Sequence, residues 1–130
     1  MRLIWDADGK KYATNEPTAE LIEELIDELD NETHTMVALD ARGLCSMIAC
    51  GGEDGRVRVN YVPEDLEKST KHLLDHQASN PEDVIHLMLQ GKKSAYKRIH
   101  TVPKYLALQA LVEFARTTTP APTMDWIDDA

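Results

Sequence analysis

The chain has 130 residues, a hydrophobic content of 42% and a formal net charge of −9. This length predicts a single domain, residues 1–130, that buries roughly two thirds of the surface of its unfolded chain. The negative charge argues against direct binding of nucleic acid, because neutralising phosphates requires a cationic surface.

The expected cellular compartment is inferred from the apolar stretches of the sequence. The first residues, MRLIWDADGK, have no signal-peptide run, and no stretch reaches the roughly 18 apolar residues that span a bilayer. We therefore expect a cytoplasmic protein that has no membrane partner. Cys45 and Cys50 fall in one predicted strand, where alternation points them to opposite faces. We expect two buried free thiols and no disulfide between them.

The charges are distributed unevenly along the chain. Residues 1–40 hold eleven acidic groups and three basic groups, a net charge of −8. Residues 92–118 hold six basic groups and one acidic group, a net charge of +5. This distribution is compatible with a basic protein partner.

A hairpin and an amphipathic helix are the first predicted elements. Asp8-Gly9 has the positive-φ chemistry of a tight turn between two short strands. After Pro17, the apolar residues of TAELIEELIDELD recur at helical spacing, which leaves a continuous acidic face on the other side. The acidic face comprises Glu20, Glu23, Glu24, Asp27, Glu28 and Asp30.

Three strand-like runs follow and predict an antiparallel meander. They are THTMVALDA, LCSMIAC and RVRVNYV, separated by turns at 40–43 and 51–55. In the third run, apolar and polar side chains alternate from Arg56 to Tyr61, which predicts one packed face and one face in water.

The second half predicts further strands and a final helix. Residues 63–83 contain a possible helical stripe in EDLEKSTKHLLDHQ and a break at Ser79-Asn80-Pro81. VIHLMLQG and YKRIHTV are expected to be strands, and Pro103 is expected to begin the last helix. The buried face of this helix is expected to be Leu106, Ala107, Ala110, Leu111 and Phe114. The fold class is therefore α+β, an antiparallel sheet of about five to seven strands with two or three helices packed on it.

One sequence feature could signify a metal enzyme. The segment HLLDH places His72 and His76 at i and i+4, the spacing of zinc ligands on a helix. Leu73 stands where a hydrolytic zinc helix carries its general-base Glu, and no third ligand is marked. We therefore expect no metal, no cofactor and no enzymatic activity, with a small metal-dependent enzyme as an alternative.

Two further patterns favour structural explanations over ligand binding. The glycine-rich segment GGEDGR carries Glu53 and Asp54 at its tip, where they would repel a phosphate, so a hairpin turn is the better interpretation. The basic residues around Tyr96 predict RNA contact only weakly, because one aromatic in an acidic chain is a poor stacking platform. These basic residues are Lys92, Lys93, Lys97 and Arg98.

The C-terminal region carries a family resemblance over residues 84–127. A short apolar strand ends in Gly91, and Val102-Pro103 opens a helix that has Phe114 near its end. Thr117, Pro120 and Trp126 follow. This order resembles immunity protein family 1 of the polymorphic toxin systems, whose members end in a Val-Pro-opened helix, a Phe, a Thr-containing turn, a Pro and a Trp in a last strand. The aromatic ring of Trp126 is expected to fasten the tail to the domain.

The resemblance implies a cytoplasmic immunity protein. Such a protein binds the toxic domain of a cognate effector, commonly a nucleic-acid deaminase and sometimes a nuclease, and occludes its active site. A toxin that attacks nucleic acid presents a basic cleft, so an acidic inhibitor gains in association rate and orientation. The alternative is a small regulatory or adaptor domain that binds another protein and has no toxin partner. The predicted partner-binding residues are Glu20, Glu23, Glu24, Asp27 and Glu28, with Glu53 and Asp54 as a second patch.

Overall fold

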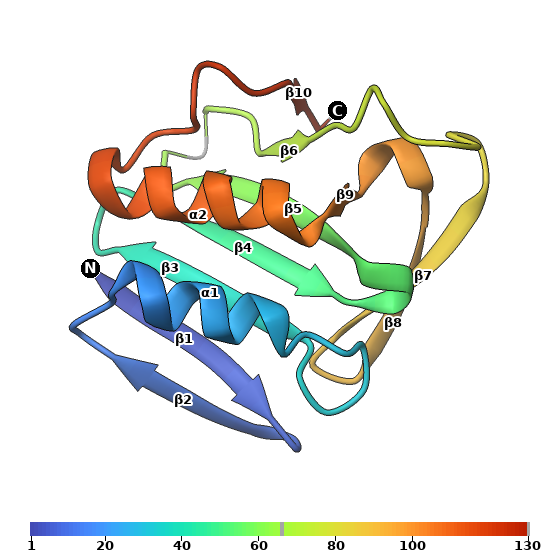
Figure 1. The fold of residues 1–130 in the computed structure, drawn as a ribbon. Helices are drawn as coiled ribbons and strands as arrows, with labels where there is room; N and C mark the ends of the chain where they lie inside the picture. The colour runs from blue at the N-terminus through green and yellow to red at the C-terminus, as the bar shows by residue number, and fades with distance from the viewer. Residues whose placement is uncertain (66, 130) are drawn as a thin grey trace.

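The structure is a computed structural model that describes residues 1–65 and 67–129. One large antiparallel sheet carries two helices, α1 (Ala19–Asp27) and α2 (Lys104–Thr117), side by side on one face (Figure 1). Its strands, in the order β10-β6-β5-β4-β3-β1-β2 with β9 beside β5, are β1 (Arg2–Ala7), β2 (Lys10–Thr14), β3 (Met36–Ala41), β4 (Cys45–Gly51), β5 (Arg56–Pro63), β6 (Lys71–Leu73), β9 (Val102–Pro103) and β10 (Trp126–Asp128). The predicted α+β class is confirmed.

Local turn chemistry sets the register of the sheet. Asp8 and Gly9 adopt φ of 53° and 80°, as a tight β1–β2 hairpin requires, and Ala7 pairs with Lys10. The predicted meander β3–β4–β5 forms with antiparallel pairing throughout. Cys45 and Cys50 are free, buried and on opposite faces, as expected. Burial raises the pKa of the Cys50 thiol to about 11, so this thiol stays protonated at neutral pH.

The core lies between the sheet and the two helices. Thr18 caps α1 by accepting a hydrogen bond from the backbone N–H of Leu21 at 3.1 Å. The buried side of α1 is Ile22, Leu25 and Ile26, as the helical spacing predicts. The predicted buried face of α2 is confirmed except that Leu106 is only partly buried, since Ala107, Ala110, Leu111 and Phe114 are fully buried.

A second, two-stranded sheet crosses one end of the large sheet. It is formed by β7 (Val84–Leu89) and β8 (Lys92–Lys97) around a turn at Gln90 and Gly91. The side chain of Asn31 holds β7 by donating to the carbonyl of His86 and accepting from the N–H of Met88. Leu87 packs directly on Gly51, where an added Cβ would lie 2.7 Å from the Leu87 Cδ2 atom.

Two of the expected elements are wrong. The stripe in residues 63–83 is not a helix, because Lys71–Leu73 forms the short strand β6 between β5 and β10. The segment YKRIHTV is not one strand, because a 3-10 turn at Arg98–His100 separates β8 from β9. In the part of the chain that the structure describes, neither helix has the length and apolarity needed to cross a bilayer.

Candidate functional site

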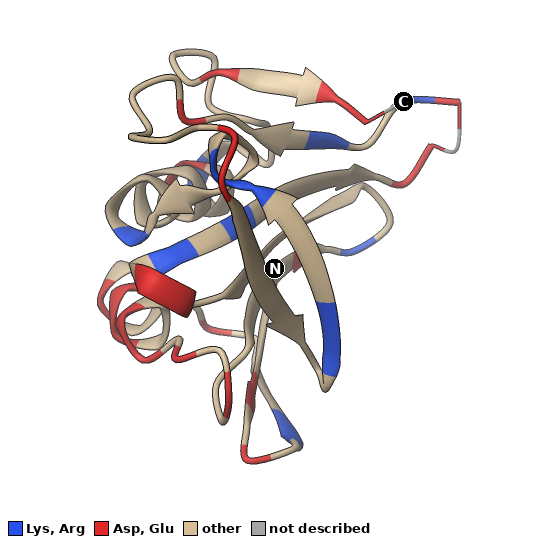
Figure 2. Ribbon diagram, turned by 90° about the vertical axis from the view of Figure 1, so that its right-hand side faces the viewer, with Lys and Arg blue, Asp and Glu red and all other residues tan. Residues whose placement is uncertain are grey.

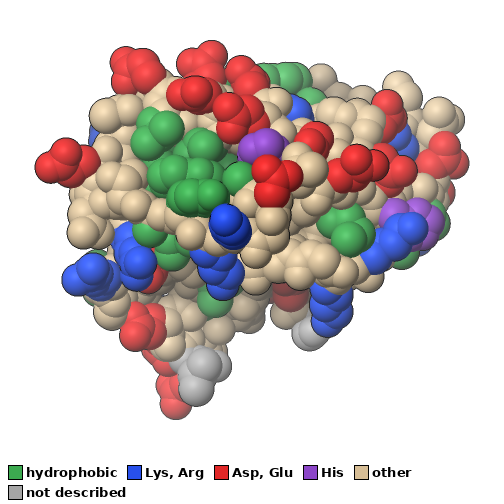
Figure 3. Space-filling view, turned by 90° about the horizontal axis from the view of Figure 1, so that it is seen from below, with side chains coloured by type: hydrophobic (Ala, Val, Ile, Leu, Met, Phe, Trp, Pro, Cys, Tyr) green, Lys and Arg blue, Asp and Glu red, His purple; other side chains and the backbone are tan. Residues whose placement is uncertain are grey.

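The exposed side of α1 carries a run of acidic side chains. Its carboxylates, which we call the α1 acidic face, are all exposed to solvent. In the ribbon of Figure 2, acidic residues follow one another along α1. In the space-filling view from below, acidic side chains line the upper edge of the molecule (Figure 3). Among the described residues, only Glu28 of this face has an ion-pair partner, His34, at a distance of 3.8 Å. The α1 acidic face comprises Glu20, Glu23, Glu24, Asp27 and Glu28.

The second predicted acidic patch has partners within the chain. A carboxylate oxygen of Glu53 accepts the backbone N–H of His86 at 2.9 Å. Asp54 forms an ion pair with Arg98 at 2.8 Å. Both residues are exposed, yet their carboxylates tie the 53–55 turn to the β7–β8 hairpin. Their contacts in the structure are therefore structural, and the sequence pattern did not predict them.

An aromatic pair lies on the β1–β2 hairpin. Trp5 and Tyr12 face each other across the β1–β2 hairpin, and their rings stack at 6.0 Å with an interplanar angle of 19°. Trp5 and Leu21 of α1 pack against the same core, while Tyr12 is 45% exposed. Figure 3 shows an apolar area beside the acidic edge. We call Trp5 and Tyr12 the aromatic shelf; the hairpin register around Asp8-Gly9 could have identified it from the sequence.

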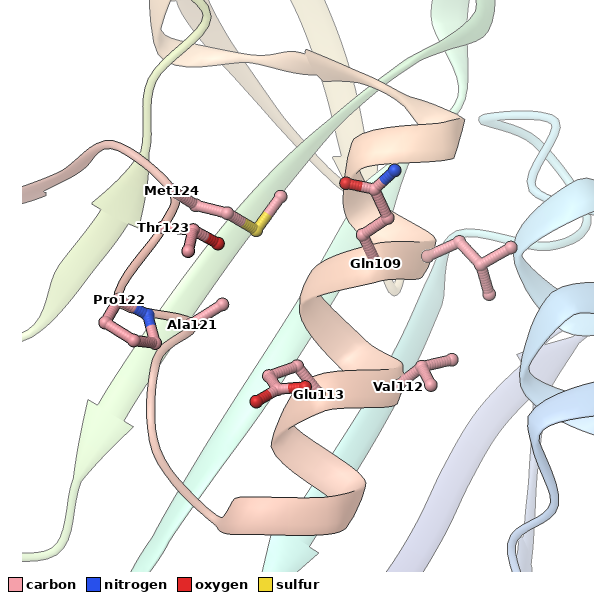
Figure 4. Close-up of a pocket in the computed structure, with 8 residues that line it drawn as sticks. Gln109, Val112, Glu113, Ala121, Pro122, Thr123 and Met124 are labelled. Carbon is pink, nitrogen blue, oxygen red and sulfur yellow. The ribbon is translucent and has the colours of Figure 1, made fainter.

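A groove runs between α2 and the chain that follows it. Its volume is about 560 Å³. Figure 4 shows Gln109 and Glu113 on the helix facing Ala121, Pro122 and Met124 on the tail. We call this cavity the α2–tail groove. Regular spacing in the sequence could not predict it, because one wall is irregular chain.

A polar cluster occupies the face of the sheet away from the helices. His72 lies on β6 and contacts Asp129 through Nδ1 and His100 through Nε2, with 2.8 Å between the two imidazole nitrogens. The guanidinium of Arg58 lies 3.5 Å from Asp129 and 4.5 Å from the ring centre of Tyr96. Burial lowers the pKa of His72 below its ordinary value, and burial followed by the Arg58 charge lowers the pKa of His100.

This cluster corrects the prediction for HLLDH. His72 and His76 do not share a helix face, because His72 is a buried strand residue and the side chain of His76 is 59% exposed. His76 instead lies 3.7 Å from Asp125. Among the described residues, no group of three or more His, Cys, Asp or Glu side chains is arranged to hold a metal ion. The contacts of His72 hold the C-terminal residues against the sheet.

The polar face of β5 is also less exposed to solvent than predicted. Arg56 is buried, and its guanidinium donates to Asp75 and to the Thr101 carbonyl at 2.8 and 2.7 Å, while its Nε donates to the Thr101 hydroxyl. The expectation of a water-covered face is therefore wrong at this position, because the segment after β8 folds over it. Such a buried ion pair fixes the path of the chain more than it adds net stability.

The basic residues near Tyr96 do not form one continuous cationic surface. Lys97 pairs with Glu82 at 2.8 Å, and Arg98 pairs with Asp54. Trp126 is partly buried against the core and pairs with Leu73 of β6, so it fastens the tail to the domain as expected, while its indole N–H donates to the carbonyl of Ala121 within the tail at 3.0 Å. No protein-family model matches the chain, and comparison with curated proteins finds no significant relative.

Proposed function

We propose that this chain is an immunity protein that binds a cognate toxin and occludes its active site. The α1 acidic face is the proposed contact surface. The observation that supports this most directly is the exposure of its five carboxylates on a helix whose other side is fixed in the core. Among the described residues, no cation of this chain pairs with the carboxylates of Glu20, Glu23, Glu24 or Asp27, so these charges are available to a partner.

Electrostatics indicates the kind of partner. Exposed carboxylates on a rigid helix produce a negative potential that attracts a basic surface and orients it before contact. Nucleic-acid enzymes carry such basic surfaces around their active sites because they bind phosphates. The resemblance of residues 84–127 to immunity protein family 1 favours a toxin of this type. An immunity protein gains from fast association, because free toxin damages the cell that makes it.

The aromatic shelf adds an apolar contact surface to the charged face of α1. Charged faces guide association, whereas tight complexes also need buried aromatic contacts near the centre of the interface. Trp5 and Tyr12 are held by their mutual stacking, and Trp5 packs against the same core as Leu21 of α1. A cationic side chain of the toxin that reaches Tyr12 would meet the exposed face of an aromatic ring.

Co-expression tests this proposal. The domain encoded by the gene next to the one for this chain, which the proposal predicts to be a toxin, is expressed in a bacterial host with and without the chain. We expect growth arrest with the toxin alone, restored growth with both proteins, and co-purification of the chain with a catalytically inactive toxin. A toxic neighbour that is neither neutralised nor bound would overturn the proposal. Binding to a basic, non-toxic protein instead would favour the adaptor function.

A further inference from the structure

The α2–tail groove is a preformed cavity with an apolar lining. Leu108 and Val112 contribute from the helix, and Ala121, Pro122 and Met124 contribute from the tail. It continues into a second hollow of about 280 Å³, because Gln109, Thr123 and Met124 line both. Together the two hollows are lined by α2 residues from Tyr105 to Glu113, a stretch along which an extended segment can lie.

The tail wall is fixed by hydrogen bonds although it contains no long element. The indole of Trp126 donates to the Ala121 carbonyl, and the N–H of Met124 donates to the same carbonyl at 3.1 Å. The N–H of Leu74 donates to the carbonyl of Asp125 at 2.9 Å, which joins the wall to the chain after β6. A ligand therefore binds without ordering this wall, which reduces the entropic cost of association.

The charges of the lining select the ligand. Glu113 lies in the groove and Asp125 lines the second hollow, whereas no Lys or Arg is among the residues that line either one. Asp75 also lines the second hollow, but its carboxylate is already paired with Arg56. Arg116 reaches Glu113 with a 2.6 Å ion pair from a side chain that is 71% exposed. An exposed pair of this kind contributes little and exchanges readily with another cation.

From these observations we infer that the α2–tail groove binds an apolar side chain flanked by Lys or Arg on an extended segment of the partner. The apolar side chain enters between Gln109 of α2 and Met124 of the tail, which face each other in Figure 4, and its basic neighbours approach Glu113 and Asp125. This inference rests on the proposed function, because the segment is assigned to the same toxin. Val112 also lines the crevice between α1 and α2, so the groove adjoins the helix that carries the acidic face.

Short peptides test the groove independently of any toxin. The probes are the peptides KKLFKK, KKSSKK and EELFEE, titrated into the full chain with labelled methyl groups. We expect KKLFKK to shift the methyl resonances of Leu108, Val112 and Met124 saturably, with much smaller shifts from the other two. Thr123→Trp places an indole over the groove and should abolish these shifts. Equal shifts with EELFEE, or shifts confined to residues outside the groove, would overturn the inference.

Opposite charges at one position sharpen the test. Gln109 is exposed on the groove side of α2. Gln109→Arg should weaken KKLFKK binding and Gln109→Glu should strengthen it, each by about threefold, as expected for one added charge near the surface. Ala95→Arg, an exposed position on β8, adds the same charge elsewhere and serves as the control. Equal effects of Gln109→Arg and Ala95→Arg would show that net charge alone governs binding, against the inference.

The toxin then separates the two proposals. If the wild-type chain captures the toxin and Thr123→Trp captures it equally well, the groove is not part of the interface and the proposed function stands. If the wild-type chain does not capture the toxin, the proposed function fails and the assignment of the segment to the toxin fails with it. Weaker capture by Thr123→Trp, with an unchanged thermal midpoint, is the expected result.

Discussion

His72 and His100 meet edge to face, with ring centres 4.9 Å apart and the Nε2 atom of His72 2.8 Å from the Nδ1 atom of His100. One of these nitrogens must accept while the other donates, so both rings cannot be fully protonated in this arrangement. The charge of Arg58 faces both rings, with Lys97 and Glu82 near His100 and Asp129 beside His72. Burial is the main cause that lowers both pKa values, and the Arg58 charge adds to it, while Asp129 opposes it.

This pair predicts that acid destabilises the fold. The pKa of each histidine is lower in the folded chain than the ordinary value of about 6.5, so the unfolded chain binds protons that the folded chain excludes. The free energy of unfolding should therefore fall as the pH drops from 7.5 through 6.5 to 5.5. Urea unfolding followed by tryptophan fluorescence measures it. His100→Asn should reduce this slope, and an identical slope in this variant would contradict the explanation.

Asp30 predicts a separate loss of stability at lower pH. Burial opposes its ionised form, but hydrogen bonds from the Thr33 hydroxyl and from the backbone of residues 32–34 outweigh burial and hold its pKa well below the usual range. Its contribution is present above the unfolded pKa of about 3.9 and is lost as the pH falls through the folded value. Asp30→Asn should reduce stability at pH 7 and leave the slope between pH 7.5 and 5.5 unchanged. A change in that slope would mean that Asp30 is coupled to His34, whose Nδ1 atom lies 3.7 Å from its carboxylate.

The Arg56–Asp75 pair predicts strong coupling between two substitutions. Arg56→Met leaves the Asp75 carboxylate, which is 8% exposed, without its guanidinium partner, so we expect a loss of about 3–5 kcal/mol. Asp75→Leu alone should cost a similar amount, because it leaves the arginine unpaired. The double variant should recover much of this loss, since no isolated charge remains. Urea unfolding of all four chains gives the coupling energy, and additive losses would show that the pair is not a unit.

The sequence predicted those parts of the fold that local chemistry determines. Asp8-Gly9 fixes a hairpin, and the spacing of Ile22, Leu25 and Ile26 fixes both α1 and the direction of its acidic face. The strand β6 was missed because it is three residues long and is held by pairing of Leu73 with Trp126, far along the chain. The spacing of the apolar residues in HLLDH is also compatible with a helix, and only the tertiary pairing with the C-terminal strand makes this segment a strand.

The candidate surfaces divide in the same way. The α1 acidic face follows from an amphipathic helix, so its exposure was predictable. The burial of Arg56 and the partners of Glu53 and Asp54 were not, because segments beyond residue 80 supply His86, Arg98 and Thr101. The α2–tail groove depends on the path of irregular chain after α2, which no periodic pattern encodes.

The aromatic shelf predicts a substitution that affects binding more than folding. Tyr12→Ala removes a stacked ring that is 45% exposed, so the loss of stability should be about 0.5–1.5 kcal/mol. Toxin capture should weaken by about 2 kcal/mol or more if Tyr12 lies at the centre of the interface. Leu44→Ala, at an exposed apolar residue in the β3–β4 turn, is the control. Calorimetric titration with inactive toxin compares the variants, and equal affinities for both would remove the shelf from the interface.

Charge reversal on α1 predicts a kinetic effect that depends on salt. Glu24→Lys combined with Asp27→Lys inverts the centre of the acidic face, while both side chains stay exposed and the buried side of α1 is unchanged. We expect the association rate with inactive toxin to fall roughly tenfold or more at low ionic strength, because complementary charge guides the encounter. The thermal midpoint should change little, because exposed charges contribute little to stability.

The matched control for this experiment changes the net charge equally. Glu64→Lys combined with Glu67→Lys alters two exposed carboxylates in the segment between β5 and β6, on the other side of α2 from α1 (Figure 1). Stopped-flow association at several salt concentrations should show a large decrease only for the α1 variant, and the two rates should converge at high salt because screening removes the guidance. Equal rates for the two variants at every salt concentration would show that the toxin does not approach through α1. A large loss that persists at high salt would instead indicate direct contacts of Glu24 or Asp27 within the complex.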